Sequence, residues 1–75
     1  MYEQIVDLIC RKKNIDRNNI SLKSSIKNDI GLNSLQIIEL IGEIEDLYDI
    51  EIPDRKLREL QTVNQVVDFL EEQTQ

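Results

Sequence analysis

The chain contains no histidine and only one cysteine, Cys10, among its 75 residues. Without histidine, the Ser–His and Cys–His pairs that activate a nucleophile cannot form, and histidine metal ligands are absent. A single cysteine permits no internal disulfide and matches no metal or redox spacing, which is typical of a reduced, cytoplasmic protein. These absences predict a protein that is not an enzyme and that holds no metal.

Aromatic residues and long apolar runs are also scarce. Tyr2, Tyr48 and Phe69 are the three aromatics, so the core must be mainly aliphatic. No apolar run approaches the ~20 residues of a membrane-spanning helix, and no signal peptide is recognisable. The formal charge of -6 argues against nucleic acid as a partner but leaves room for partners with basic surfaces.

The composition fits one small folded domain over residues 1–75, which we expect to be a monomer. Apolar residues make up 40% and charged residues 32%, a balance typical of a soluble globular chain rather than a disordered one. A core of this size is too small to surround a deep pocket with several catalytic groups.

Apolar residues recur at helical spacing in three segments, and Pro53 separates a fourth, shorter one that Asp54 can cap. Asn14 is the expected stop of the first helix, and Thr62 with Gln65 has the spacing of a capping box for the last. We therefore predict an all-α fold. Its helices should span residues 2–13, 34–48, 55–60 and 63–72, with a frayed tail at 73–75.

Residues 14–33 form the expected long first loop. The stretch "NIDRNNISLKSS" is rich in Asn, Asp and Ser, whose side chains compete for backbone hydrogen bonds in turns. Scattered aliphatic residues predict that the loop packs over the core, and a short helical turn inside it is compatible with the pattern. Loops this long in small domains are often functional.

The predicted helix at 34–48 has two apolar faces. One is a core stripe made of Ile37, Leu40, Ile41, Ile44, Leu47 and Tyr48. At ~100° per residue, Leu35, Ile38 and Gly42 fall on the other side, framed by Glu39, Glu45 and Asp46. Gly42 costs roughly 1 kcal/mol against alanine there. Either the outer strip packs under the long loop, or it is a docking surface where another molecule comes close.

Ser34 is predicted at the first position of this helix, directly after Asn33. Its hydroxyl would lie near free backbone N–H groups and the positive end of the helix dipole, a place that tolerates phosphate. Asn33 with Gln36 can form a capping box, and Gly31 permits a turn that other residues resist. Ser34 could be a plain capping residue, because nothing nearby activates it. Any chemistry on its hydroxyl must come from another protein.

The stretches "DIGLNSL", "EIEDLYDIEIPD" and "LQTVNQVVDFL", in this helix order, resemble the acyl carrier proteins, whose motif is Asp-Leu-Gly-x-Asp-Ser-Leu. The resemblance spans nearly the whole chain. It implies a four-helix bundle of acyl-carrier type, with 4'-phosphopantetheine attached to Ser34 by a phosphopantetheinyl transferase that uses coenzyme A and Mg²⁺. It also implies that Asp29, Gly31, Asn33 and Leu35 flank the attachment site.

By the same resemblance, the helix that begins at Ser34 is the one that partner enzymes recognise, often through basic patches. Acyl-loading, condensing or modifying enzymes would be such partners. The resemblance also implies that the aliphatic core can make room for a bound acyl chain. The expected partner-docking residues are Leu35, Ile38, Glu39, Gly42, Glu45 and Asp46.

The chain departs from the pattern of the fatty-acid carriers in charge. Asn33 replaces the usual Asp, Gln36 replaces an acid, and Arg55, Lys56 and Arg58 make the short helix basic. These departures favour a free-standing carrier dedicated to one specialised lipid or polyketide-type pathway. The alternatives are an aminoacyl or peptidyl carrier, although "GLNS" lacks the Gly-Gly-His/Asp-Ser pattern of that group, and an unmodified helical interaction module.

Overall fold

The computed structural model of the protein describes residues 1–73, which form four α-helices and two further helical turns. The helices are α1 (Tyr2–Lys12), α2 (Ser34–Tyr48), α3 (Asp54–Leu57) and α4 (Val63–Gln73). Within these residues no strand forms, and one isolated antiparallel bridge joins Ser25 to Thr62. The all-α prediction, with three longer helices and one short helix, is confirmed.

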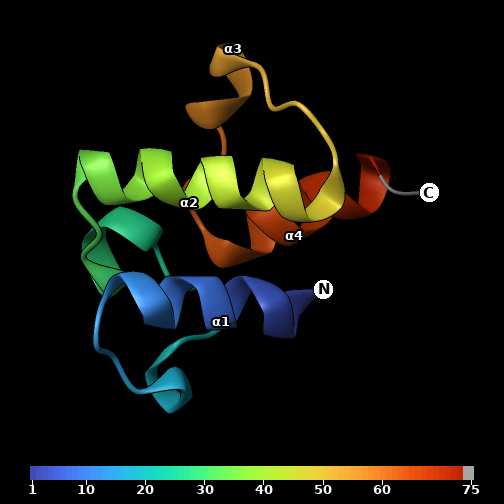
Figure 1. Ribbon diagram of the computed structural model, residues 1–75. Coiled ribbons are helices and arrows are strands. Elements are labelled where there is room, and N and C mark those ends of the chain that lie inside the picture. The colour runs from blue at the N-terminus through green and yellow to red at the C-terminus, as the bar shows by residue number, and fades with distance from the viewer. Residues whose placement is uncertain (74–75) are drawn as a thin grey trace.

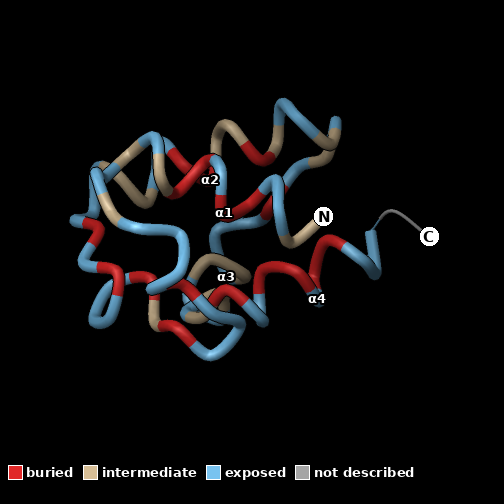
Figure 2. The backbone as a smooth tube through the Cα atoms, turned by 90° about the horizontal axis from the view of Figure 1, so that it is seen from below, coloured by how far each residue is buried: buried red, intermediate tan, exposed pale blue. Residues whose placement is uncertain are grey.

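Helix α1 packs against both α2 and α4, and α3 lies on the side of α2 that faces away from α1 (Figure 1). Buried stretches occur in each of the three longer helices (Figure 2). Ile5, Ile9, Leu40, Ile44 and Leu70 are completely buried, and Phe69 is the one aromatic residue among the buried hydrophobic side chains described. Full burial of such side chains stabilises by ~1.5–3 kcal/mol each, so this aliphatic core holds the bundle together.

The long connection between α1 and α2 is more regular than predicted, because it contains two capped turns. The 3-10 turn η1 (Arg17–Asn19) begins where the Asp16 carboxylate accepts the Asn18 N–H at 2.9 Å. The π-helical turn η2 (Ile26–Ile30) begins where the Ser25 hydroxyl accepts the Asn28 N–H at 3.1 Å. The Asn, Asp and Ser content that predicted a loop thus serves these caps.

The connection is also fastened to the bundle. Arg17 donates to Asp7 at 2.6 Å and to Glu3 at 2.5 Å, and the bond to Asp7 raises the pKa of Arg17 above its ordinary value. The predicted packing of the connection over the core is confirmed. Ile20, Ile26, Ile30 and Leu32 are buried.

Several predicted boundaries were wrong. Helix α1 ends at Lys12, before Asn14, and α3 ends at Leu57, because residues 58–61 continue as tight turns. Asp54 does not cap α3: it is the first helical residue, after Pro53, and no side chain caps this helix. The capping box of Thr62 and Gln65 is confirmed, with bonds of 3.2 and 2.9 Å.

The C-terminal end of α2 also corrects the prediction. Leu47 was assigned to the core stripe but is 50% exposed, because it lies at the edge of the stripe beside Leu8 and Arg11. Tyr48 is half-buried, and its hydroxyl donates to Gln4 at 2.5 Å. Burial raises the pKa of Tyr48, which keeps the hydroxyl protonated as a donor. The predicted frayed tail falls partly on α4, which includes Gln73, and otherwise lies outside the described residues.

Candidate functional site

Ser34 is the first residue of α2, and its side chain is exposed. The cap of this helix is made by its neighbours instead: the Gln36 N–H donates to the Asn33 side chain at 2.8 Å, and the Asn33 N–H donates to the Gln36 side chain at 3.0 Å. The predicted capping box is therefore confirmed. Within residues 1–73 the Ser34 hydroxyl makes no hydrogen bond, so Ser34 is not the cap.

The backbone around Ser34 offers donors to an anion. Of the first N–H groups of α2, Asn33 and Gln36 are satisfied by the capping box. The N–H groups of Ser34 and Leu35 have no intrahelical acceptor, as expected at a helix N-terminus. Together with the positive end of the helix dipole, they favour a negatively charged group bonded to the Ser34 oxygen.

The turn that leads into Ser34 depends on Gly31, which closes η2 with a left-handed φ of 86°. Its carbonyl oxygen accepts the Lys13 ammonium at 3.3 Å, and a Cβ at Gly31 would lie 2.7 Å from that Nζ. The Gln36 amide also donates to the Lys12 carbonyl at 3.1 Å. The serine turn is therefore tied to the C-terminal end of α1. Sequence reasoning missed Lys12 and Lys13, because their contacts span 24 and 18 residues, respectively.

Asp29, one of the predicted flanking residues, stabilises the loop. Its carboxylate accepts the Ser25 N–H at 2.7 Å, across the base of η2. This hydrogen bond holds the Asp29 side chain against the turn that ends at Gly31. Asp29 contributes to the site by shaping the backbone that leads into Ser34.

The outer face of α2 is open rather than covered by the loop. Leu35 is 65% exposed and Ile38 is 64% exposed, so the interpretation in which they pack under the connection is wrong. A Cβ placed on Gly42 would meet no atom within 4 Å. No neighbour within the described chain therefore requires a glycine at this position.

The carboxylates around this strip differ in their surroundings. Glu39 and Asp46 are exposed, as a docking role requires. Glu45 is half-buried, and its carboxylate accepts the Ile52 N–H at 2.7 Å, which closes the turn after α2. Glu43 forms an ion pair with Lys12 of α1. The freely presented charge of the outer face thus comes mainly from Glu39 and Asp46.

The described residues include neither a metal-binding cluster nor a membrane-spanning helix. Among residues 1–73 there is no group of three or more His, Cys, Asp or Glu side chains that could hold a metal ion. In the same part of the chain no helix has the length and apolar character needed to cross a membrane.

An unbonded serine hydroxyl at a helix N-terminus of a small helical bundle fits the class of carrier domains, which other enzymes load. A family profile described as "Phosphopantetheine attachment site" matches residues 3–70. The chain is 39% identical over 69 residues to the acyl carrier protein of Amoebophilus asiaticus, covering 92% of this chain and 86% of that protein. It is 35% identical over 75 residues to the acyl carrier protein of Clostridium acetobutylicum, covering 100% and 97%.

The chain therefore belongs to the acyl carrier protein family, whose members are carriers rather than enzymes. The cofactor of this family is 4'-phosphopantetheine, and the residues at the start of α2 fit it: the Ser34 hydroxyl is exposed, and the adjacent N–H groups can donate hydrogen bonds to a phosphate. Members of the family interact with a phosphopantetheinyl transferase and with the enzymes that use the loaded carrier.

Proposed function

We propose that the protein is a free-standing, monomeric acyl carrier that bears 4'-phosphopantetheine on Ser34. It holds acyl intermediates as thioesters and delivers them to partner enzymes of a specialised lipid or polyketide-type pathway. The observation that carries the proposal is the Ser34 hydroxyl, exposed and without a hydrogen bond while Asn33 and Gln36 make the cap.

The attachment step requires an enzyme from outside, because no base lies against Ser34 in the described chain. The Ser34 Oγ–phosphorus bond forms as the bond between that phosphorus and adenosine 3',5'-bisphosphate breaks in coenzyme A, and the serine proton passes to the transferase. The bound arm supplies a terminal thiol that carries acyl groups as thioesters. The role of this chain is to present the hydroxyl and to place N–H donors beside the new phosphodiester.

Delivery to partners would use the outer face of α2. Leu35 and Ile38 offer exposed apolar surface, and Glu39 and Asp46 offer exposed carboxylates next to it. A partner with an apolar contact patch inside a basic rim is complementary to this face. Gly42 allows the surface of that partner to approach the helix closely.

The proposal of a specialised pathway rests on the charged positions at which this carrier differs from the pattern of the fatty-acid carriers. Asn33 and Gln36 retain the capping box but provide no carboxylate beside the serine. Arg55 and Arg58, exposed on and just after α3, form no ion pair in residues 1–73. The partners of this carrier should therefore tolerate positive charge near α3.

Intact mass spectrometry tests the proposal. Incubation with coenzyme A and a broad-specificity transferase should add the mass of one arm to the protein and none to Ser34→Ala. Ser21→Ala, another exposed serine, is the matched control and should be modified normally. An unmodified wild-type protein would contradict the proposal. The mass of the cargo on protein from its host separates an acyl carrier from an aminoacyl or peptidyl one.

A further inference from the structure

A groove of about 490 Å³ opens beside the start of α2, between η2 and the turn that follows α3. Ile37, Leu57 and Leu60 line it; each is partly buried and packs against the core, so the groove has an apolar floor. Lys27 and Arg58 are also among the residues that line it. The Gln61 amide donates to the Arg58 carbonyl at 3.1 Å, which holds the backbone at Arg58.

The charge of this groove is opposite to that of the whole chain. No carboxylate lines it, although the chain has 15 acidic against 9 basic residues. Lys27 and Arg58 are exposed, and neither forms an ion pair in the part of the chain that the structure describes. The groove therefore combines an apolar floor with two uncompensated cations, Lys27 and Arg58, and we call it the positive groove.

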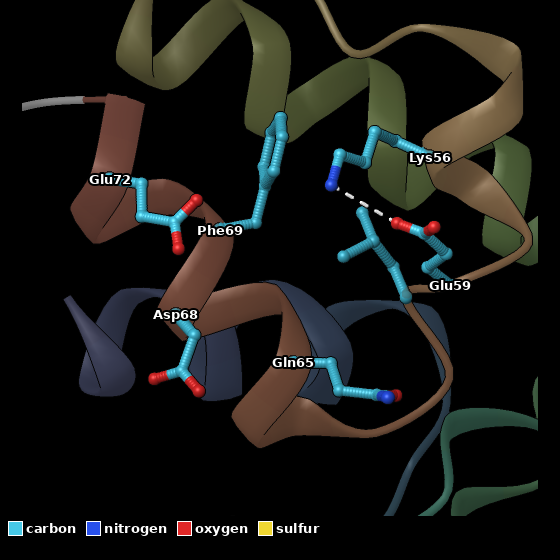
Figure 3. A pocket seen from close by; sticks show the side chains of 7 residues that line it. Lys56, Glu59, Gln65, Asp68, Phe69 and Glu72 are labelled. Carbon is cyan, nitrogen blue, oxygen red and sulfur yellow. Dashed lines mark ion pairs between the residues drawn. The ribbon is translucent and has the colours of Figure 1, made fainter.

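A second groove, between α3 and α4, is lined by different charges from the groove at Lys27 and Arg58 (Figure 3). Its volume is about 370 Å³, and it is lined by one cation, Lys56, against Glu59, Asp68 and Glu72. Lys56 is already paired with Glu59 at 3.1 Å, and its ammonium lies 5.8 Å from the centre of the Phe69 ring. An anion has no free cation to bind there, so the positive groove is a local feature rather than a general property of α3.

The positive groove lies within reach of the attachment serine. Ile37 is three residues after Ser34 on α2, so their Cβ atoms are neighbours at about 5–6 Å. A flexible arm on the Ser34 oxygen can therefore fold back over Ile37 into the groove. The wall formed by Arg58 is contributed by a different element from the one that carries the arm.

We infer that this groove holds the end of the arm-bound cargo, and that it favours acyl groups that terminate in a carboxylate, as in a dicarboxylic acyl thioester. The inference rests on the proposed attachment of the arm to Ser34. The methylene groups of such a cargo lie on Ile37 and Leu60, and its carboxylate meets Lys27 and Arg58. A plain alkyl chain would leave both cations unpaired at its end.

The test loads the protein from four coenzyme A derivatives and records backbone amide NMR shifts. The cargoes are succinyl, its neutral isostere succinamoyl, butyryl and none. We expect the succinyl form alone to shift the amides of Lys27, Arg58 and Leu60. These shifts should shrink at about 1 M salt, where the Debye length falls to about 3 Å. They should be lost in Lys27→Gln/Arg58→Gln and retained in Arg55→Gln, which removes a cation of α3 outside the groove.

The other outcomes overturn the inference in distinguishable ways. Equal shifts with succinamoyl or butyryl would mean that the groove does not recognise the carboxylate. The same shifts in the protein that carries the arm without cargo would mean that Lys27 and Arg58 bind the phosphodiester of the arm. In both cases the added mass would leave the proposed function intact. Failure to gain mass from any derivative would instead remove the proposed function, and this inference with it.

Discussion

The inner and outer faces of α2 are built from the same residue types but have different surroundings. Leu40 and Ile44 on the inner face are 0% exposed, whereas Leu35 and Ile38 on the outer face are 65% and 64% exposed. The fold accounts for the inner pair, because α1 packs on that side. Nothing in the described chain covers the outer pair. The comparison teaches that the hydrophobic residues of one helix can stabilise the bundle on one face and be left open to a partner on the other.

The largest expected effect on stability comes from the inner face. Ile44→Ala should lower the free energy of unfolding by about 2–5 kcal/mol, because the truncated side chain leaves a cavity in the core. Ile38→Ala, the matched change on the outer face, should alter it by no more than about 0.5 kcal/mol. Urea denaturation of both variants measures the difference. Equal destabilisation by the two changes would mean that Ile38 contributes to the packing of the fold as Ile44 does.

Gly31 should be the next most sensitive position. Gly31→Ala is expected to cost about 1–2 kcal/mol, because a side chain is strained at a φ of 86° and would also displace Lys13. The distorted turn should slow the modification of Ser34 as well. Thermal unfolding and a transferase rate assay test both effects. An unchanged melting temperature would contradict this account of the turn.

Gly42 should behave in the opposite way. Gly42→Ala is expected to stabilise the protein by about 1 kcal/mol, because alanine is the better helix former and open space surrounds the position. If a partner approaches closely here, the same change should weaken binding to that partner. Denaturation together with transferase binding measures the two effects. A gain in stability with unchanged binding would remove Gly42 from the docking surface.

Asn33→Asp should change the free energy of unfolding little, by no more than about 0.5 kcal/mol, because asparagine and aspartate cap equally well. The added carboxylate should raise the rate of modification by up to about fivefold, the factor that ~1 kcal/mol of charge pairing provides. Comparing initial rates with one transferase checks this. A slower rate would show that asparagine suits the enzyme of this carrier better.

Local patterns predicted much of this structure. Apolar spacing located the three longer helices, and the spacing of Asn33 and Gln36 predicted the cap of α2. Contacts between distant segments were not predictable: Lys13 meets Gly31, and the carboxylate of Glu45 turns to the Ile52 N–H. Leu47 was misassigned because periodicity alone does not tell how far a neighbouring helix extends over a stripe. The groove near Ser34 depends on three separated segments and has no sequence pattern.

The most direct test of the account is to localise the arm in protein purified from its host. Trypsin cleavage after Lys27 and Arg55 releases residues 28–55, in which Ser34 is the sole serine. Fragmentation of this peptide should place 4'-phosphopantetheine, with or without its acyl cargo, on Ser34. An unmodified peptide, or an arm on a residue outside it, would contradict the assignment of the open end of α2 as the carrier site.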